Sequence, residues 1–389
     1  MTRLPPEILE DPALIAVLDA VEAQGNRAYL VGGAVRNALL EQPVDDIDIA
    51  TDARPEHVQR LALSAGLKPV PTGIEHGTVT IVSDGRGFEV TTFRRDVETD
   101  GRRAVVAFSD NLDEDAHRRD FTMNALYADR TGAVIDPVGG LPDLEARRLR
   151  FVGDPEQRIR EDYLRILRFF RFHAWYGHEA EPGAVAACAA LKDGLEQIAR
   201  ERIGSEMKKL LAAPAPVASI LLMAETGILD QLLPGAEPGA LSDLVALEAR
   251  ENIPPSWSRR LAALSGGRDC ADALRLSKDE IRGQTALAEA ITAKWSLNEA
   301  GYRLGIRAGT DYALLAGSRR MALPPNWRPQ VARAAEARLP ISARDLMPQL
   351  TGPAVGRGLQ AAETLWIESD FTRPAPALIQ AALQAGEEG

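Results

Sequence analysis

Residues 30–36 read Leu-Val-Gly-Gly-Ala-Val-Arg, and the triplet Asp46-Ile47-Asp48 follows ten residues later. The apolar run over 28–31 predicts a strand that turns at Gly32 and Gly33 into a helix over 34–40. Glycine lets a backbone approach a phosphate closely, and the amino end of a helix favours an anion. This segment therefore predicts a strand–turn–helix unit with a place for phosphate groups, although such glycine pairs also occur in plain tight turns.

The triplet falls in a second predicted strand, over 46–50. Because side chains alternate along a strand, Asp46 and Asp48 share one face while Ile47 and Ile49 share the other. Two carboxylates on one face repel each other unless a cation lies between them, and magnesium is commonly held by carboxylates together with substrate phosphates. The alternation therefore predicts a magnesium site, the alternative being a solvated acidic pair.

A third carboxylate, Glu89, falls inside a predicted strand over 88–93. A charge without a partner is costly there if it is buried. Beside the acidic pair, Glu89 would complete a site in which two metal ions clamp the attacking and leaving oxygens of a displacement.

The rest of the first 140 residues mixes strands with helices. Helices are predicted over 9–24 and 54–64, and Asp84-Gly85 predicts a hairpin between strands over 78–82 and 88–93. After about residue 143 the apolar spacing is helical to the end, starting with one helix over 154–176. The chain is therefore predicted to be α+β, with its strands confined to the first part.

Composition excludes several classes of protein. The chain has 389 residues, 45% of them apolar and 26% charged, which is ordinary for a globular protein of two to four domains. Its two cysteines are far apart, which argues against a disulfide framework and a zinc site. No apolar run approaches the roughly 18 residues of a membrane span, and residues 1–10 lack a signal-peptide core. We therefore expect a cytoplasmic protein without a membrane partner.

The charges are unevenly distributed. A net charge of −11 argues against a nucleic-acid partner. However, only six of the 45 basic residues are lysine, and residues 147–171 hold eight arginines against four acids. The planar fork of arginine suits phosphates and base edges. A basic seam on an acidic body therefore fits a nucleic-acid enzyme, while a set of solvated helix faces stays open as the alternative.

Several motifs follow one another in a fixed order between residues 28 and 210. They are Gly-Gly-Ala-Val-Arg from Gly32, Asp-Ile-Asp-Ile-Ala-Thr from Asp46, Glu-Val-Thr-Thr-Phe-Arg from Glu89, Arg-Arg-Asp-Phe-Thr-Met-Asn-Ala-Leu from Arg118, Asp-Pro-Val-Gly-Gly from Asp136 and Glu-Asp-Tyr-Leu-Arg from Glu161. Together they resemble the class II tRNA nucleotidyltransferase family, which contains CCA-adding enzymes and bacterial poly(A) polymerases. This family lies within the polymerase-β-like nucleotidyltransferase superfamily. Beyond residue 210 the resemblance is mainly one of helical character, plus residues 342–359, which are similar to the tail of the family.

The resemblance implies a four-part organisation. Residues 1–140 would form a polymerase-β-like catalytic head with a mixed sheet and helices. All-helical parts would follow: a neck over 141–210 that recognises the base, a body over 211–325 that binds RNA, and a tail over 326–389 that binds tRNA.

The resemblance also implies roles for single side chains. Asp46 and Asp48 would hold catalytic Mg²⁺, and Glu89 would activate the 3′ hydroxyl of the RNA. The other implied contacts are to the nucleotide: Gly32, Gly33 and Arg36 to its triphosphate, and Arg119, Asp120 and Asn124 to its sugar and phosphates.

Asp162 and Arg165 match the pair that reads the incoming base in the family. Three positions apart on a predicted helix, they would be neighbours on one face. A carboxylate only accepts hydrogen bonds and a guanidinium only donates them, which suits the amine and ring nitrogen of cytosine or adenine. Uracil and guanine present a carbonyl instead and would leave the carboxylate unpaired, which gives strong rejection. A plain ion pair on a helix surface is the alternative.

Two features bear on the exact activity. Residues 94–115 have little apolar content and predict a mobile loop. Family members that add only the two cytidines have a shorter loop there, so its length favours addition of both C and A. One residue departs from the family: the usual Asp after Val-Arg is Asn37, which keeps hydrogen-bonding groups but loses a charge.

The activity implied is template-independent addition of CCA to tRNA, with CTP and ATP as substrates and pyrophosphate as the released product. DNA is not an expected partner. Two alternatives stay open: a poly(A) polymerase acting on RNA 3′ ends, and a catalytically inactive RNA-binding relative. Addition of only part of CCA also stays open.

Overall fold

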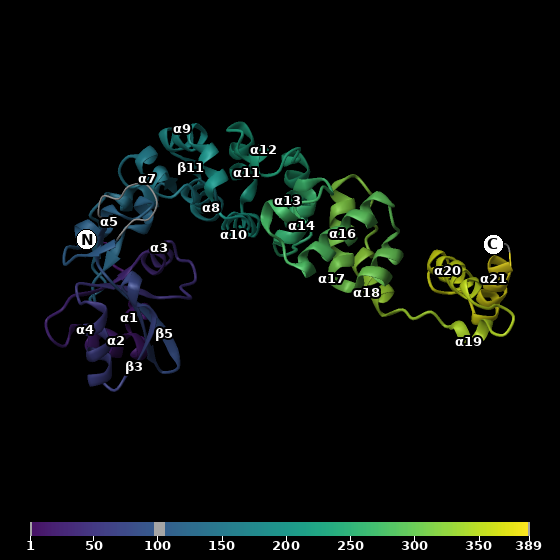
Figure 1. Cartoon of the computed structure of the whole chain (residues 1–389), viewed down its shortest axis with the longest axis horizontal. Coiled ribbons are helices and arrows are strands. Elements are labelled where there is room, and N and C mark those ends of the chain that lie inside the picture. The colour runs from purple at the N-terminus through teal and green to yellow at the C-terminus, as the bar shows by residue number, and fades with distance from the viewer. Residues whose placement is uncertain (1, 97–105, 388–389) are drawn as a thin grey trace. The chain divides into compact units, whose positions relative to one another are not determined.

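The computed structural model describes residues 2–96 and 106–387 (Figure 1). The chain divides into two compact units. One comprises Met1–Glu206 with Glu225–Ile228, and the other comprises Met207–Ala224 with Leu229–Gly389. Residues 97–105, in the middle of the loop predicted over 94–115, lie outside the described residues.

The first unit is built on a mixed sheet whose described strands follow the order β3-β4-β5-β2-β1-β8-β9. These strands are β1 (Ala28–Val31), β2 (Asp48–Thr51), β3 (Lys68–Gly73), β4 (Thr78–Ser83), β5 (Arg86–Thr92), β8 (Tyr127–Ala128) and β9 (Val134–Ile135). Strands β2 and β5 run parallel, and the other neighbours are antiparallel. The parallel pair brings together two segments that are about forty residues apart in the sequence.

One face of this sheet is covered by helices α2 (Pro12–Glu22) and α4 (Pro55–Ser64), which contact β4 and β5. Apolar residues alternate along β4 and β5, and those on the covered face, such as Ile81 and Val90, are fully buried. The intervening residues, Glu89 among them, point to the opposite face, where Glu89 is exposed. The sheet therefore has one face in the core and one that presents polar groups.

Short elements and helices complete the first unit. They are α1 (Pro6–Leu9), α3 (Gly33–Leu39), η1 (Ile74–His76), β6 (Arg94–Asp96), β7 (Val106–Phe108), α5 (Leu112–His117), η2 (Thr122–Asn124), α6 (Gly140–Glu145), β10 (Arg148–Leu149), α7 (Pro155–Glu161), α8 (Leu164–Tyr176), β11 (Glu179–Ala180), α9 (Pro182–Ala190), η3 (Lys192–Gln197) and α10 (Arg200–Leu211), which crosses into the second unit. Phe121 packs against Phe151 and Phe169, with ring centroids 5.0 and 6.1 Å away. This aromatic core fixes α8 against the segment that carries Arg119 and Asp120.

The single helix predicted over 154–176 is wrong. Helix α7 ends at Glu161, the backbone is extended at Asp162 (φ −155°, ψ 105°), and α8 begins at Leu164. The Asp162 carboxylate accepts a hydrogen bond from the Leu164 amide at 3.1 Å. Aspartate competes with helical bonding in this way because its short side chain reaches the backbone, and here it starts a new helix.

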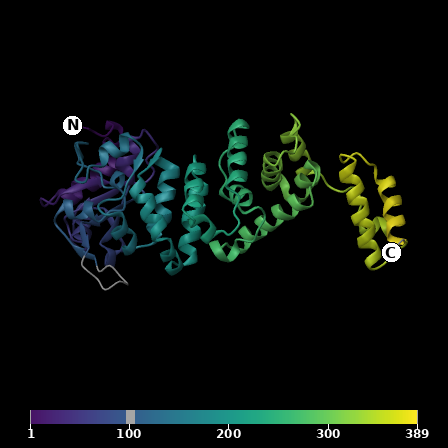
Figure 2. The same cartoon turned by 90° about the horizontal axis from the view of Figure 1, so that it is seen from above.

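The second unit is helical throughout its described part. Its helices are α11 (Pro216–Glu225), α12 (Ile228–Leu232), α13 (Pro238–Arg250), α14 (Trp257–Ser265), α15 (Ala271–Leu274), α16 (Lys278–Thr292), α17 (Leu297–Ser318), α18 (Trp327–Glu336), α19 (Ala343–Leu346), α20 (Pro353–Glu368) and α21 (Ala375–Glu387). One apolar core gathers residues of α13, α14, α16, α17 and α18, and a second joins α19, α20 and α21. Helices α20 and α21 lie side by side at the carboxyl end of the chain (Figure 2).

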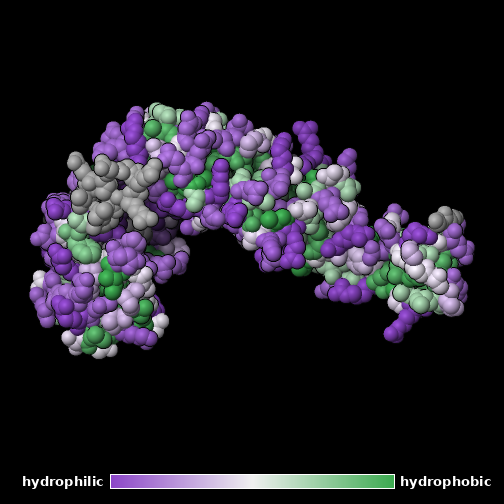
Figure 3. All heavy atoms as spheres, viewed as in Figure 1, coloured by the Kyte–Doolittle hydropathy of each residue, from purple (hydrophilic) through white to green (hydrophobic). Residues whose placement is uncertain are grey.

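The surface shown in Figure 3 is largely hydrophilic on both units. Among the described residues, none of the helices has the length and apolarity needed to cross a bilayer. The predicted α+β fold is confirmed: a mixed sheet lies in the first part of the chain, and helices make up the rest. The boundaries of the four predicted parts stay predictions.

Candidate active site

The glycine turn lies between β1 and α3. Gly32 has a φ of +65°, which side-chain-bearing residues rarely adopt. A Cβ atom there would also lie 3.4 Å from Nη1 of Arg119. Glycine is therefore required at position 32 by its conformation, and its absence of a side chain lets the Arg119 guanidinium lie against the turn.

Asp48 and Glu89 come together across the parallel strands. Asp48 is the first residue of β2 and pairs in register with Glu89 on β5, so both side chains point to the same face of the sheet. Asp48 is exposed to solvent, but the protein groups around it partly desolvate its carboxylate, which raises its pKa, and the negative charges of Glu89 and Asp46 raise this pKa further. The positive charge of Arg119 acts in the opposite direction. Four predicted site residues, from three separate stretches of the chain, thus share one electrostatic environment.

Asp46 lies two residues before β2, outside the strand, and is exposed. Within residues 2–96 and 106–387, no three His, Cys, Asp or Glu side chains form a ready metal-binding cluster. Carboxylates that repel one another have no reason to converge without a cation. The oxygen-only donor set of Asp46, Asp48 and Glu89 nevertheless fits a hard divalent cation, which prefers carboxylate oxygens and keeps positions for substrate phosphates.

Arg119 is held by a residue that sequence reasoning missed, Asp115 on α5. The Arg119 guanidinium donates to Asp115 Oδ2 at 3.0 and 3.3 Å, and the Tyr127 hydroxyl donates to the same oxygen at 2.7 Å. Asp115 is 1% exposed and also accepts the Arg94 amide at 3.1 Å. Burial alone would raise the pKa of Asp115, but Arg119, the Tyr127 hydroxyl and Arg118 hold it below its usual value. The available signal was its position four residues before Arg119 in the sequence, a spacing at which opposite charges can pair where the chain turns helically.

Asp120 and Asn124 belong to a second buried network. Asp120 accepts hydrogen bonds from Arg168 of α8 at 2.9 Å and from the Asn124 amide at 3.1 Å. Although burial raises it, the pKa of Asp120 is net lowered by the charge and hydrogen bond of Arg168 and by the Asn124 bond. The oxygen of Asn124 in turn accepts from Arg36. This network joins α8 to α3. Asp120 and Asn124, which are predicted to contact the nucleotide, therefore also connect elements of the first unit.

Arg36 is 6% exposed and lies on aromatic rings. Its guanidinium carbon is 3.9 Å from the ring centroid of Tyr176 and 5.2 Å from that of Phe172, and Nη2 donates to the Tyr176 hydroxyl at 2.9 Å. Burial lowers the pKa of Arg36, although Tyr176 acts in the opposite direction. The N–H groups of Arg36, the predicted triphosphate contact, thus bind other side chains of the protein. A ligand would reach only the small exposed part of the guanidinium.

Asp162 and Arg165 do not share a helix face as predicted, because the helix breaks between them. Asp162 accepts from Arg202 at 2.8 Å, while Arg165 binds the Glu161 carboxylate and donates to the Arg158 carbonyl at 2.8 Å. They are still close along the chain, since the Arg165 amide donates to the Asp162 carbonyl at 2.9 Å. The junction between α7 and α8, rather than one helix face, presents the two groups.

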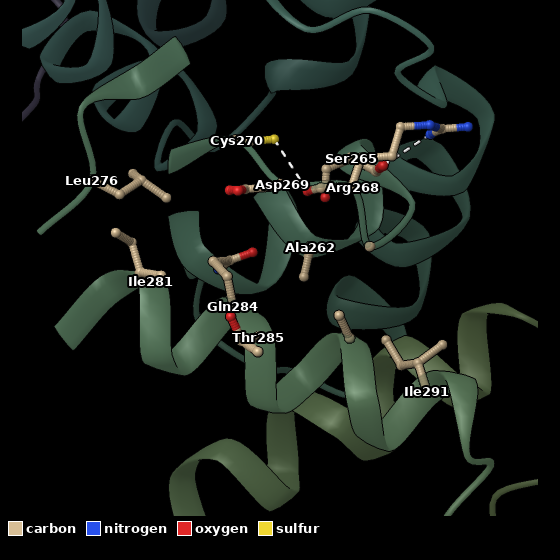
Figure 4. Close-up of a pocket in the computed structure, with 12 residues that line it drawn as sticks. Ala262, Ser265, Arg268, Asp269, Cys270, Leu276, Ile281, Gln284, Thr285 and Ile291 are labelled. Carbon is tan, nitrogen blue, oxygen red and sulfur yellow. Dashed lines mark hydrogen bonds between the residues drawn. The ribbon is translucent and has the colours of Figure 1, made fainter. Parts of the chain in front are cut away.

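A separate cavity of about 270 Å³ lies in the second unit between α14 and α16 (Figure 4). Ala262, Ile281 and Ile291 supply apolar walls, and the Cys270 thiol donates to the Arg268 carbonyl at 3.5 Å. None of the predicted site residues lines this cavity. We therefore place the candidate active site in the first unit.

Two known families match the sequence. Residues 28–150 match the poly A polymerase head domain, and residues 179–239 match the probable RNA- and SrmB-binding site of polymerase A. The CCA-adding enzyme of Streptococcus gordonii is 46% identical over 216 residues, which is 55% of this chain and 52% of the relative. The chain belongs to the class II tRNA nucleotidyltransferase and poly(A) polymerase family. This confirms the resemblance drawn from the ordered motifs.

Other members of this family match over longer stretches. The CCA-adding enzyme of Streptococcus pneumoniae is 40% identical over 270 residues, or 68% of this chain and 66% of the relative. The sequence match to the first curated relatives spans only about half of their length. The CCA-adding enzyme of Bacillus stearothermophilus, solved in complex with CTP, has a TM-score of 0.75 and 29% identity, covering 97% of this chain and 98% of that one. The Thermotoga maritima CCA-adding enzyme, solved with tRNA, shares the fold with a TM-score of 0.71 at 20% identity, covering 99% of both chains.

Proposed function

We propose that this chain adds CCA to the 3′ ends of tRNA without a nucleic-acid template, using CTP and ATP and releasing pyrophosphate. The observation that carries the proposal is the in-register pairing of Asp48 with Glu89 beside the Gly32 turn and Arg119. Membership of the family implies use of a divalent metal, and relatives named CCA-adding enzymes match at 40–46% identity. The basic residues of α7 and α8 support RNA as the partner, and we propose the cytoplasm as the site of action.

The reaction proposed is an in-line phosphoryl transfer. The 3′ oxygen of the RNA forms a bond to the α-phosphorus of the nucleotide, and the bond from this phosphorus to the β-phosphate oxygen breaks, so pyrophosphate leaves. Asp46 and Asp48 would hold Mg²⁺, which when bound lowers the pKa of the attacking hydroxyl and neutralises the leaving group. Glu89 would orient the 3′ hydroxyl and accept its proton. Arg119 would bind phosphate oxygens at the glycine turn, because its Nη1 lies against Gly32.

Base choice is proposed to lie with Asp162 and Arg165. Each already has protein partners, Arg202 for the carboxylate and Glu161 for the guanidinium, which would hold the pair in position for a base. Asp120 and Asn124 would contact the sugar and phosphates from the network of Arg168. Arg36 would contribute positive charge to the triphosphate from its buried position.

The test is to sequence the products formed on a tRNA that ends at its discriminator base. With CTP and ATP together we expect two cytidines followed by one adenosine, and with CTP alone two cytidines. Asp48→Ala should lower incorporation by at least about 10³-fold, because one carboxylate ligand is lost where charge develops, with tRNA affinity changed less than twofold. Cytidine addition that stops at two residues even with ATP would indicate partial activity instead.

Poly(A) polymerase is the second candidate, because the head matches the domain named for that enzyme. Runs of adenosine that form without CTP would establish it and overturn the first proposal. Loss of incorporation in every assay, with tRNA still bound, would identify a catalytically inactive relative.

A further inference from the structure

Asn37 follows Arg36 on α3, and its side-chain amide has different partners at its two ends. Asn37 Oδ1 accepts hydrogen bonds from Nη2 and Nε of Arg36 at 2.9 and 3.2 Å. Its Nδ2 donates to the carbonyl of Pro43 at 3.0 Å. The Asn37 side chain therefore joins the predicted triphosphate arginine to the loop between α3 and β2.

That loop carries Asp46. Its first half is held by the end of α3, since the Gln42 amide donates to the Asn37 carbonyl at 2.9 Å and the Glu41 amide to the Ala38 carbonyl at 3.2 Å. The bond from Asn37 Nδ2 extends this hold to Pro43, three residues before Asp46. One residue thus restrains two consecutive positions of the loop, through its backbone and through its side chain.

An aspartate at position 37 could make only one half of this arrangement. A carboxylate has no hydrogen to donate, so it cannot bind the Pro43 carbonyl, and its charge would face the oxygen of that carbonyl. It could still accept from Arg36. Two further side chains that accept hydrogen bonds from Arg36, those of Asn124 and Tyr176, are also neutral. Asparagine therefore orients Arg36 without neutralising its charge and restrains the loop as well.

We propose that Asn37 is a positioning residue that restrains the loop before Asp46 through Pro43 while it orients Arg36. The part concerning Asp46 rests on the proposed function, because it assumes that Asp46 holds the metal. The restraint of the loop does not depend on that assumption.

The restraint is tested by hydrogen exchange of the full chain without metal, nucleotide or tRNA. In Asn37→Asp and Asn37→Ala we expect the Gln42 amide to exchange at least fivefold faster, because the turn opens once Pro43 is released. Gln42→Glu is the matched control, because it adds a negative charge to the same loop and leaves the side-chain hydrogen bonds of Asn37. Exchange of the amide at position 42, relative to its intrinsic rate, should therefore stay within twofold of the unmodified chain. Equal exchange at Gln42 in Asn37→Asp, Asn37→Ala and the unmodified chain would overturn the proposal.

The positioning effect is tested by titrating Mg²⁺ in the tRNA addition assay. Asn37→Asp should raise the Mg²⁺ concentration for half-maximal rate about fivefold and leave kcat at saturating Mg²⁺ within twofold. Asn37→Ala should in addition raise the KM for CTP, because Arg36 loses a hydrogen-bond acceptor. A general folding defect would instead lower kcat and the Tm in both Asn37→Asp and Asn37→Ala. Faster exchange with an unchanged Mg²⁺ requirement would overturn the positioning role. If the unmodified chain incorporates no nucleotide, the proposed function fails while the exchange result still decides the restraint.

Discussion

At the scale of single residues, Asp115 shows how a buried carboxylate can position a guanidinium that is itself mostly buried. Its side chain is 2% exposed, and one of its oxygens accepts from both Arg119 and Tyr127. With Nε and Nη2 of Arg119 bound to Asp115, Nη1 remains directed at the Gly32 turn. Asp115 thus orients Nη1 of Arg119, although Asp115 would not itself contact the nucleotide.

We predict that Asp115→Asn lowers the free energy of unfolding by about 3 kcal/mol, because it leaves a largely buried guanidinium without its counter-charge. It should also raise the KM for CTP more than it lowers kcat. Denaturant unfolding and initial rates measure the two effects. Asp113→Asn, an exposed change on the same helix, should cost less than about 1 kcal/mol. Equal effects of the two substitutions would refute the positioning role.

The buried carboxylates of Asp115 and Asp120 make the free energy of unfolding depend on pH. The pKa values of Asp115 and Asp120 are lowered in the folded chain, so below about pH 4 the unfolded chain takes up protons first. The stabilisation is therefore complete above that pH and is lost as the pH falls through the folded pKa values. The free energy of unfolding should fall between pH 5 and pH 3, with a shallower slope in Asp115→Asn.

At the scale of elements, the break between α7 and α8 decides how the proposed base-reading pair is presented. A continuous helix would give Asp162 and Arg165 one fixed spacing. The observed junction instead ties Asp162 to Arg202 of α10 and Arg165 to Glu161 of α7. Three helices therefore set the geometry of two side chains.

We predict that Arg165→Ala lowers the preference for CTP over UTP by about 10- to 100-fold, the discrimination expected from one well-placed hydrogen-bonding pair. Ratios of kcat/KM for the two nucleotides measure it. Arg160→Ala is the control, since Arg160 lies on α7 in an exposed pair with Glu156. Selectivity that stays the same in Arg165→Ala would exclude the residue from base choice.

At the scale of the whole molecule, the second unit has its own buried charge network. Glu248 of α13 is 2% exposed and accepts from Arg259 at 2.7 Å and from Arg260 at 2.8 Å. Arg259 also binds Asp311 at 2.6 Å, and Arg260 donates to the carbonyls of Leu211 and Ala213. This network lies far along the chain from Asp48 and Glu89, in the other compact unit.

We predict that Glu248→Ala lowers the free energy of unfolding of the second unit by about 3–5 kcal/mol, because two buried guanidinium groups lose their carboxylate. CTP binding to the first unit should change less than twofold. Circular dichroism during denaturation and equilibrium nucleotide binding test this separation. Glu289→Ala, an exposed change on α16, should cost less than about 0.5 kcal/mol. If Glu248→Ala lowered CTP affinity as strongly as it lowered the free energy of unfolding, nucleotide binding by the first unit would depend on the stability of the second unit, contrary to this prediction.

Some features of this protein were determined by the sequence alone. Period-2 alternation placed Asp48, Glu89 and their apolar neighbours in strands, although β2 begins at Asp48 and not at Asp46 as predicted. The glycine pair predicted the turn into α3. Both predictions depend on residues that are adjacent in the chain. The order of the motifs was sufficient for the family and for the α+β class. The helix break at Asp162 was missed, because its aspartate is compatible with a helix until the Leu164 amide and Arg202 become its partners.

Only the tertiary structure decided which distant groups meet. The pairing of Asp48 with Glu89 required the parallel alignment of β2 and β5, and the burial of Arg36 required Tyr176, 140 residues further along the chain. The restraint of Arg119 by Asp115 and Tyr127 likewise depends on the packing of α5 against β8. Such contacts arise from the burial of apolar faces and the pairing of desolvated charges, which involve residues that are remote in sequence and leave no periodic pattern in it.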